Sequence, residues 1–195
     1  MNNHFTRGSG VLEGFLSKKR AEKANSLISK SLTNGKILDI GCGYFPHFLV
    51  NTNFSEKYGI DPSVNLDLVK KEGLVLTKTR VDNKKLPYKD NFFDTVTMLA
   101  VFEHIDGNKL DAVLIEILRV LKKNGIFIIT TPSPWSDKLL HQMAKIGLIS
   151  SEEIHDHKSH YDMKTILKII SNTGFKNIKN GYFELGFNMW IKAEK

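Results

Sequence analysis

The chain has 195 residues, of which 41% are hydrophobic and 25% are charged, as in one ordinary globular domain. Its single cysteine, Cys42, excludes an internal disulfide framework and a zinc site built from several thiolates. No apolar run approaches the roughly 20 residues that span a bilayer, and the first ten residues hold no apolar signal-peptide stretch. The sequence therefore predicts a cytoplasmic protein without a membrane span.

The net charge of +7 is concentrated near the N-terminus, where residues 1–36 carry seven Lys/Arg against two Asp/Glu. This excess indicates either a site for an anionic substrate or nucleic acid, or a solvated helix face. Leu16, Ala24 and Leu27 recur at helical spacing between the charges, which favours the helix face. We expect residues 1–35 to form a helical arm that packs on a single domain over residues 36–195.

Short apolar segments bounded by turn residues predict the strands. They cover Lys36–Ile40, Lys57–Ile60, Leu74–Val81, Thr95–Leu99, Gly125–Thr130, Phe175–Gly181 and Leu185–Ala193. Helical spacing of apolar residues predicts the helices. They cover Phe48–Asn51, Asn108–Lys123, Ser136–Ile149 and Met163–Asn172.

The helix over Asn108–Lys123 is expected to end with Lys122 and Lys123 in its last turn, where they would complement its dipole.

The spacing of the strands defines the expected topology. The last two strands are too close for a helical crossover, so they should pair antiparallel. Strands that alternate with helices predict an α/β, Rossmann-like doubly wound sheet, mostly parallel with a C-terminal antiparallel strand. In such sheets the ligand lies outside the carboxyl ends of the strands.

A glycine turn follows the first predicted strand. Gly41 and Gly43 let the backbone bend tightly and approach a ligand. Asp61 ends the second strand, where a carboxylate can accept hydrogen bonds from two ribose hydroxyls. A dinucleotide fingerprint would place a third glycine at position 46, which is Pro46 here. The pattern favours an adenosine-containing ligand without phosphates.

Five ordered segments resemble class I S-adenosylmethionine-dependent methyltransferases, most closely the small-molecule branch of type 11 and type 23 methyltransferase domains. They are Ile37–Gly43 (ILDIGCG), Gly59–Ser63 (GIDPS), Asp82–Pro87 (DNKKLP), Asp90–Ile105 (DNFFDTVTMLAVFEHI) and Leu118–Pro132 (LRVLKKNGIFIITTP). The resemblance implies an enzyme that uses S-adenosylmethionine and methylates a small-molecule acceptor, at O or N.

The resemblance also implies roles for individual residues. The cofactor would be contacted by Asp39, Gly41, Cys42, Gly43, Asp61, Pro62, Asp82, Asn83, Leu99 and Ala100. Among these, Asp39 would help to hold the amino group of the methionine part, Asp61 the ribose hydroxyls, and Asp82 the adenine amine. The family often has a third glycine where this chain has Phe45, so its loop is expected to be stiffer.

Methylation of a hydroxyl requires removal of its proton, and histidine suits this near neutral pH. His104, at the end of the fourth strand, is the first candidate for the base. An acceptor-side insertion is expected at about residues 133–162, where His155, His157 and Trp135 would contact the acceptor. Together with His160 and Asp156 the histidines could also ligate a metal, but their spacing matches no familiar zinc motif, and we predict none.

The residues fit other functions less well. An adenine or cytosine-amino methyltransferase of nucleic acids usually has Asn/Asp-Pro-Pro-aromatic after strand four, where this chain reads Leu99–Glu103 (LAVFE), so nucleic acid is disfavoured. A 5-methylcytosine enzyme needs a cysteine nucleophile, and Cys42 lies in the glycine turn. A catalytically silent binding protein of the same fold remains open, and an NAD-dependent oxidoreductase is weakened by Pro46. The acceptor and the oligomeric state are left undetermined.

Overall fold

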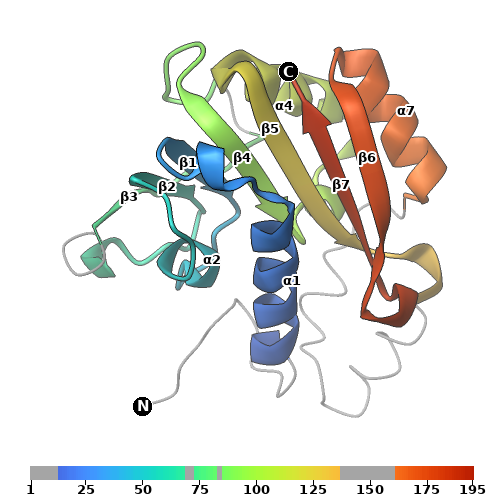
Figure 1. The fold of residues 1–195 in the computed structure, drawn as a ribbon, viewed down its shortest axis with the longest axis horizontal. Helices are drawn as coiled ribbons and strands as arrows, with labels where there is room; N and C mark the ends of the chain where they lie inside the picture. Colours follow the sequence, from blue (N-terminus) through green and yellow to red (C-terminus); the bar gives the residue numbers. More distant parts are fainter. Residues whose placement is uncertain (1–12, 69–72, 83–84, 137–160) are drawn as a thin grey trace.

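The computed structural model describes residues 13–68, 73–82, 85–136 and 161–195. Its centre is one seven-stranded sheet with the order β3-β2-β1-β4-β5-β7-β6 (Figure 1). The strands are β1 Lys36–Ile40, β2 Glu56–Ile60, β3 Leu74–Thr77, β4 Phe93–Leu99, β5 Leu121–Pro132, β6 Lys176–Phe183 and β7 Asn188–Glu194. The predicted fold class is confirmed.

The first five strands are parallel, and β7 pairs antiparallel with both β5 and β6. The C-terminal hairpin that the short spacing predicted is therefore present. Because β5 and β7 run in opposite directions, Asn188 at the start of β7 lies opposite Pro132 at the end of β5. The tip of the β6–β7 hairpin thus lies at the carboxyl edge of the parallel strands, where ligands of such sheets bind.

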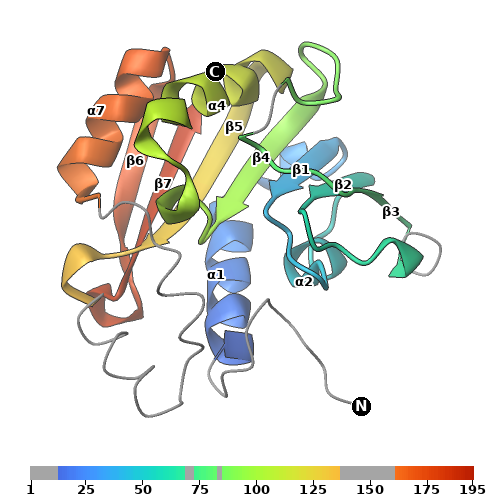
Figure 2. The same ribbon diagram turned by 180° about the vertical axis from the view of Figure 1, so that it is seen from behind.

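Helices cover both faces of the sheet (Figures 1 and 2). On one face α1 (Glu13–Leu27) and α2 (His47–Val50) pack through a core that includes Ala21, Ala24 and Leu49. On the other face the core joins the sheet to α4 (Gly107–Val120) and α7 (Met163–Thr173). Within β5, both faces of Gly125–Thr130 are buried, which explains the nearly all-apolar sequence of that part.

Helix α7 shows how local residues set an element's ends. The Asp162 carboxylate accepts a hydrogen bond from the Thr165 amide at 2.8 Å, which caps the N-terminus. Gly174 ends the helix at φ 108°, a left-handed conformation that suits glycine. The predicted helix over Met163–Asn172 is confirmed.

The predicted boundary between the helix and the strand at residues 120–123 is wrong. Helix α4 ends at Val120, and Lys122 and Lys123 belong to β5. Leu121 pairs with Phe93, and the Lys122 ammonium bonds both carboxylate oxygens of Asp94 at 2.9 and 2.8 Å. These long-range contacts stabilise an extended backbone in place of a last helical turn.

Two further boundaries differ from expectation. Strand β3 ends at Thr77, so the predicted extension to Val81 is wrong. Strand β7 begins at Asn188, so the predicted start at Leu185 is wrong as well, because Leu185 lies in the left-handed 3-10 turn η4 (Glu184–Gly186). Most of the predicted helix over Ser136–Ile149 lies outside the described residues. The division into an arm over residues 1–35 and a domain over 36–195, and the insertion at about 133–162, stay predictions. No helix within the described ranges has the length and apolar character needed to cross a bilayer.

Candidate functional site

The glycine bend after β1 is held against the end of β2. Gly41 and Gly43 have φ of 74° and 76°, which residues with a β-carbon rarely adopt. The Gly41 and Cys42 amides donate to the Ile60 carbonyl at 2.8 and 3.2 Å. A β-carbon at position 41 would lie 2.2 Å from Val101 Cγ2, so only glycine fits beneath the segment that follows β4.

Asp61 connects the two strand ends. Its buried carboxylate accepts the Gly43 amide at 3.1 Å through Oδ2, and the Ser63 amide and hydroxyl at 2.7 and 2.5 Å through Oδ1. Pro62 follows directly and is partly exposed. The predicted pair of glycine bend and terminal carboxylate is thus one hydrogen-bonded unit at the carboxyl edge.

Asp39 is a second buried carboxyl group at this edge. Burial raises its pKa to about 7, opposed by a hydrogen bond from Thr97 Oγ1 and assisted by the negative charge of Asp61. Thr97 is its direct partner across the β1–β4 pair and donates to Asp39 Oδ1 at 2.7 Å. A cation placed beside Asp39 would favour the ionised carboxylate and lower this pKa.

Cys42 lies between these groups, but its side chain is buried in the core. Its sulfur would be 2.9 Å from a β-carbon at Gly59, and burial raises the pKa of the thiol. At this position the backbone belongs to the glycine bend, and the side chain packs against β2.

Asp82 is surrounded by basic side chains. Arg80 Nε and Lys109 Nζ lie 2.9 and 3.4 Å from its carboxylate. The pKa of Asp82 is lowered, mainly by the hydrogen bond from Arg80. Asn83, predicted beside it, lies outside the described residues. Asp82 is thus an ionised acceptor whose lone pairs are partly occupied.

The end of β4 carries unusual backbone geometry. Ala100 has φ 55°, a left-handed conformation that is strained for alanine, and its amide donates to Thr130 O at 2.8 Å. Leu99, just before it, is partly buried against the α1 side of the core. The backbone here is fixed between β4 and β5.

His104 follows in a single 3-10 turn, η3 (Phe102–His104). Its neighbour Glu103 is buried and accepts a hydrogen bond from Thr131 Oγ1 of β5 at 3.0 Å, so the turn is anchored to two strands. The His104 side chain is partly exposed. The structure therefore places His104 just beyond the end of β4, at the carboxyl edge.

Trp135 lies farther along the same edge. It is 53% exposed, and its ring centroid is 4.7 Å from that of Phe187, the residue before β7. His155 and His157, together with His160 and Asp156, lie outside the described residues. Among the residues that the structure does describe, no group of three or more His, Cys, Asp or Glu could hold a metal.

Several contacts of the site were missed from the sequence. Thr97 beside Asp39, Val101 over Gly41 and Thr131 beside Glu103 each come from another strand or its loop. Their only sequence signal is a polar residue inside an apolar strand, which applies to Thr97 and Thr131.

Comparisons with known proteins agree with this geometry. A family model described as a methyltransferase domain matches residues 13–180. An uncharacterized protein of Methanocaldococcus jannaschii is 33% identical over 77% of this chain and 60% of its own length. The ubiquinone/menaquinone biosynthesis C-methyltransferase of Chromobacterium violaceum is 27% identical over 60% of this chain and 53% of its own length.

A solved structure supports the fold over nearly the whole chain. It is a SAM-dependent methyltransferase of Thermotoga maritima, described as a possible histamine N-methyltransferase, with a TM-score of 0.72 and 21% identity over 95% of this chain and 91% of that chain. This likeness shows the fold. Because the family model also covers most of the chain, the chain belongs to the methyltransferase-domain family of class I, S-adenosylmethionine-dependent methyltransferases.

Proposed function

We propose that this chain transfers a methyl group from S-adenosylmethionine to a small-molecule acceptor, at an oxygen or a nitrogen. The observation that carries the proposal is the buried Asp61 carboxylate bonded to the Gly43 amide across the ends of β1 and β2. The chain spans about 60% and 53% of the length of two curated relatives that it matches. The activities of those longer proteins are therefore not transferred to it, and the proposal rests on the residues of this chain.

The residues present fit the donor's polar groups. The donor has an ammonium group, and Asp39 is a buried carboxyl group whose ionised form needs a nearby cation. Its ribose has two hydroxyls, and Asp61 offers carboxylate oxygens beside the glycine bend. Asp82, Leu99 and Ala100 would complete the donor side, Asp82 by accepting from the adenine amine.

When bound, the donor supplies a methyl group that is already activated by its sulfonium charge. The chain's own task is then to align the acceptor at about 3–3.5 Å from that carbon. We assign His104 to take the acceptor's proton, since η3 is anchored by Glu103 and Thr131 and keeps the imidazole at the carboxyl edge.

We propose that Trp135, His155 and His157 contact the acceptor. Support comes from Trp135, which lies just after β5 on the carboxyl edge and packs on Phe187. Its half-exposed indole gives an apolar wall with one hydrogen-bond donor.

Calorimetric titration with S-adenosylmethionine tests the donor side. We expect Asp61→Ala to weaken binding by roughly 10- to 100-fold, because each charge-assisted hydrogen bond contributes about 1.5–3 kcal/mol. Asp67→Ala, which removes an exposed carboxylate from the next turn, is the matched control and should leave the dissociation constant unchanged. Equal affinities of wild type and Asp61→Ala, or binding of NAD in place of the donor, would overturn the proposal.

A metabolite screen with labelled donor then tests the transfer. Label in a small molecule identifies the acceptor and the methylated atom. Donor binding without any transfer would instead identify a catalytically silent member of the family.

A further inference from the structure

The tip of the β6–β7 hairpin presents an apolar side chain to solvent. Its 3-10 turn η4 (Glu184–Gly186) has φ of 52°, 56° and 90° at three consecutive residues, two of which are not glycine. A left-handed backbone is unfavourable for residues with a β-carbon. Leu185, at the centre of the turn, is 95% exposed. The chain thus adopts a strained turn whose result is a leucine directed into water.

This turn is held firmly by serine side chains that follow β5. The Ser133 amide and the Ser136 hydroxyl both donate to the Phe187 carbonyl at 2.8 Å, and the Ser133 hydroxyl donates to the Gly186 carbonyl at 2.7 Å. Trp135, between the two serines, packs on Phe187 and stays half exposed. We call Trp135, Leu185 and Phe187 the apolar tip. Because these hydrogen bonds hold the turn against the end of β5, Leu185 is exposed on a fixed backbone.

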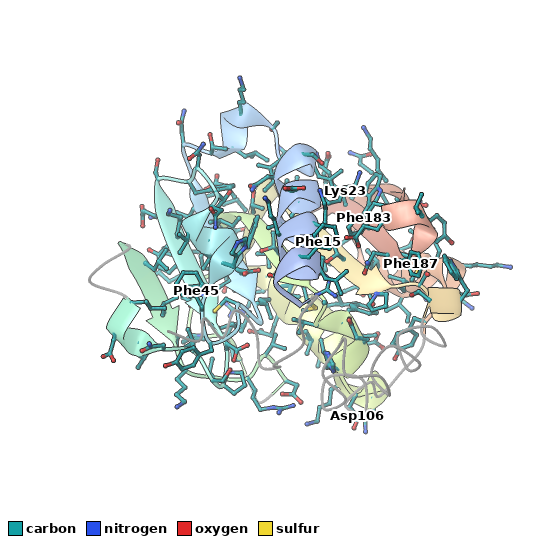
Figure 3. The ribbon with its side chains drawn as sticks, turned by 90° about the horizontal axis from the view of Figure 1, so that it is seen from below. Phe15, Lys23, Phe45, Asp106, Phe183 and Phe187 are labelled. Atoms are coloured by element: carbon teal, nitrogen blue, oxygen red, sulfur yellow. The ribbon has the colours of Figure 1, made fainter. Side chains whose placement is uncertain are left out.

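Basic side chains of α1 lie beside the apolar tip. Lys19 and Arg20 are close enough to Glu184 of η4 for their charges to act on its carboxylate. Lys23 lies over the Trp190 ring, 4.6 Å from its centroid. Figure 3, seen from the carboxyl edge, shows Lys23, Phe183 and Phe187 together on the hairpin side of α1. Lys19 also pairs with Glu22, so three cations (Lys19, Arg20 and Lys23) face two carboxylates (Glu22 and Glu184), which leaves a small positive excess beside the tip.

We propose that this edge of the molecule docks on an anionic phospholipid surface. Leu185 would enter the boundary between headgroups and acyl chains. Trp135 beside it, proposed above as an acceptor contact, would stay at the level of the headgroups, where an indole is favoured. The α1 cations would lie against lipid phosphates. A membrane suits a small protruding anchor with basic side chains beside it, whereas a protein partner of standard size buries about 800 Å² on each side.

Vesicle sedimentation tests the proposal. The wild-type chain should bind vesicles of phosphatidylcholine that contain about a third phosphatidylglycerol and should not bind phosphatidylcholine alone. High salt should weaken the binding, because it screens the cations. Leu185→Asp should reduce binding about tenfold or more. Ile115→Asp, which replaces a similarly exposed apolar residue on α4 across the sheet, should bind like wild type.

Tryptophan fluorescence locates the contact, because the chain has only Trp135 and Trp190. Brominated lipids in the anionic vesicles should quench the wild-type emission, and Trp135→Phe should lose most of that quenching. Titration with S-adenosylmethionine checks that Leu185→Asp is folded, and it keeps the result separate from the proposed methyl transfer.

Absence of binding to the anionic vesicles overturns the proposal, as does an equal loss in Ile115→Asp. Quenching that persists in Trp135→Phe also overturns it. If Leu185→Asp instead abolishes a concentration-dependent dimer in sedimentation velocity, the tip contacts a second copy of the chain and the lipid assignment is wrong.

Discussion

The two ends of the sheet use left-handed backbone in opposite ways. At the β1–β2 end it occurs at Gly41 and Gly43, and the carboxylates around the bend are buried. At the β6–β7 end it occurs at Glu184 and Leu185, and the leucine is exposed. The glycine bend leaves its backbone open to close approach, whereas the hairpin tip holds a strained turn around an exposed side chain. The two proposals, donor binding and lipid contact, therefore concern separate parts of one carboxyl edge.

Asp39 gives the largest expected effect at the buried end. A raised pKa in the folded state means that its stabilising protonated form is fully present below about pH 4 and is lost as the pH rises to about 7. Asp39→Asn keeps an acceptor for Thr97 and removes the buried charge. Its free energy of unfolding should therefore exceed that of wild type by roughly 2–4 kcal/mol at pH 8 and by little at pH 4. Urea unfolding at the two pH values measures this, and an equal gain at both would refute the assignment.

Substitution of His104 tests whether this residue is the base in the proposed methyl transfer. Because general-base catalysis contributes about 10²-fold or more, His104→Ala should reduce kcat by about a hundredfold on an acceptor found by the screen. Donor affinity should be unchanged, since the residue lies beyond the glycine bend. Asn108→Ala, on the exposed start of α4, serves as the control. Unaltered turnover in His104→Ala would remove the residue from the mechanism.

Substitutions of Gly41 and Gly73 distinguish the energetic cost of a left-handed backbone from that of steric overlap. Gly41→Ala adds a left-handed alanine and a contact of 2.2 Å with Val101, so the free energy of unfolding should fall by about 2–3 kcal/mol. Gly73→Ala has a similar positive φ with nothing within 4 Å, and it should lose only about 1 kcal/mol. Urea midpoints of both variants measure the difference. The double variant with Val101→Ala should recover the steric part, and equal losses in the two single variants would contradict the close packing.

Substitution of Leu185 should give the smallest change in the free energy of unfolding, and the change should be a gain, opposite to that of Gly41→Ala. Glycine adopts φ 56° without steric penalty, so Leu185→Gly should raise the free energy of unfolding by about 0.5–1 kcal/mol. Thermal unfolding can detect this gain. A loss of stability would mean that the leucine contributes packing, which would weaken the contrast between the two ends.

The sequence was most informative where a local rule decides the structure. Strand β1, the glycine bend, Asp61 at the end of β2 and helix α7 follow from residue type and spacing, and each is present. The end of α4 was misplaced because the pairing of Leu121 with Phe93 and the Lys122–Asp94 ion pair depend on residues far apart in the chain. For the same reason the sequence did not reveal Thr97 beside Asp39 or the left-handed Ala100.

Val101 lies close enough to the glycine bend that a β-carbon at Gly41 would overlap it, and it directly precedes η3, which carries His104. With the roles proposed for Gly41 and His104, we expect a displacement of the bend toward Val101 to shift the histidine as well, so the donor and acceptor sides would move together.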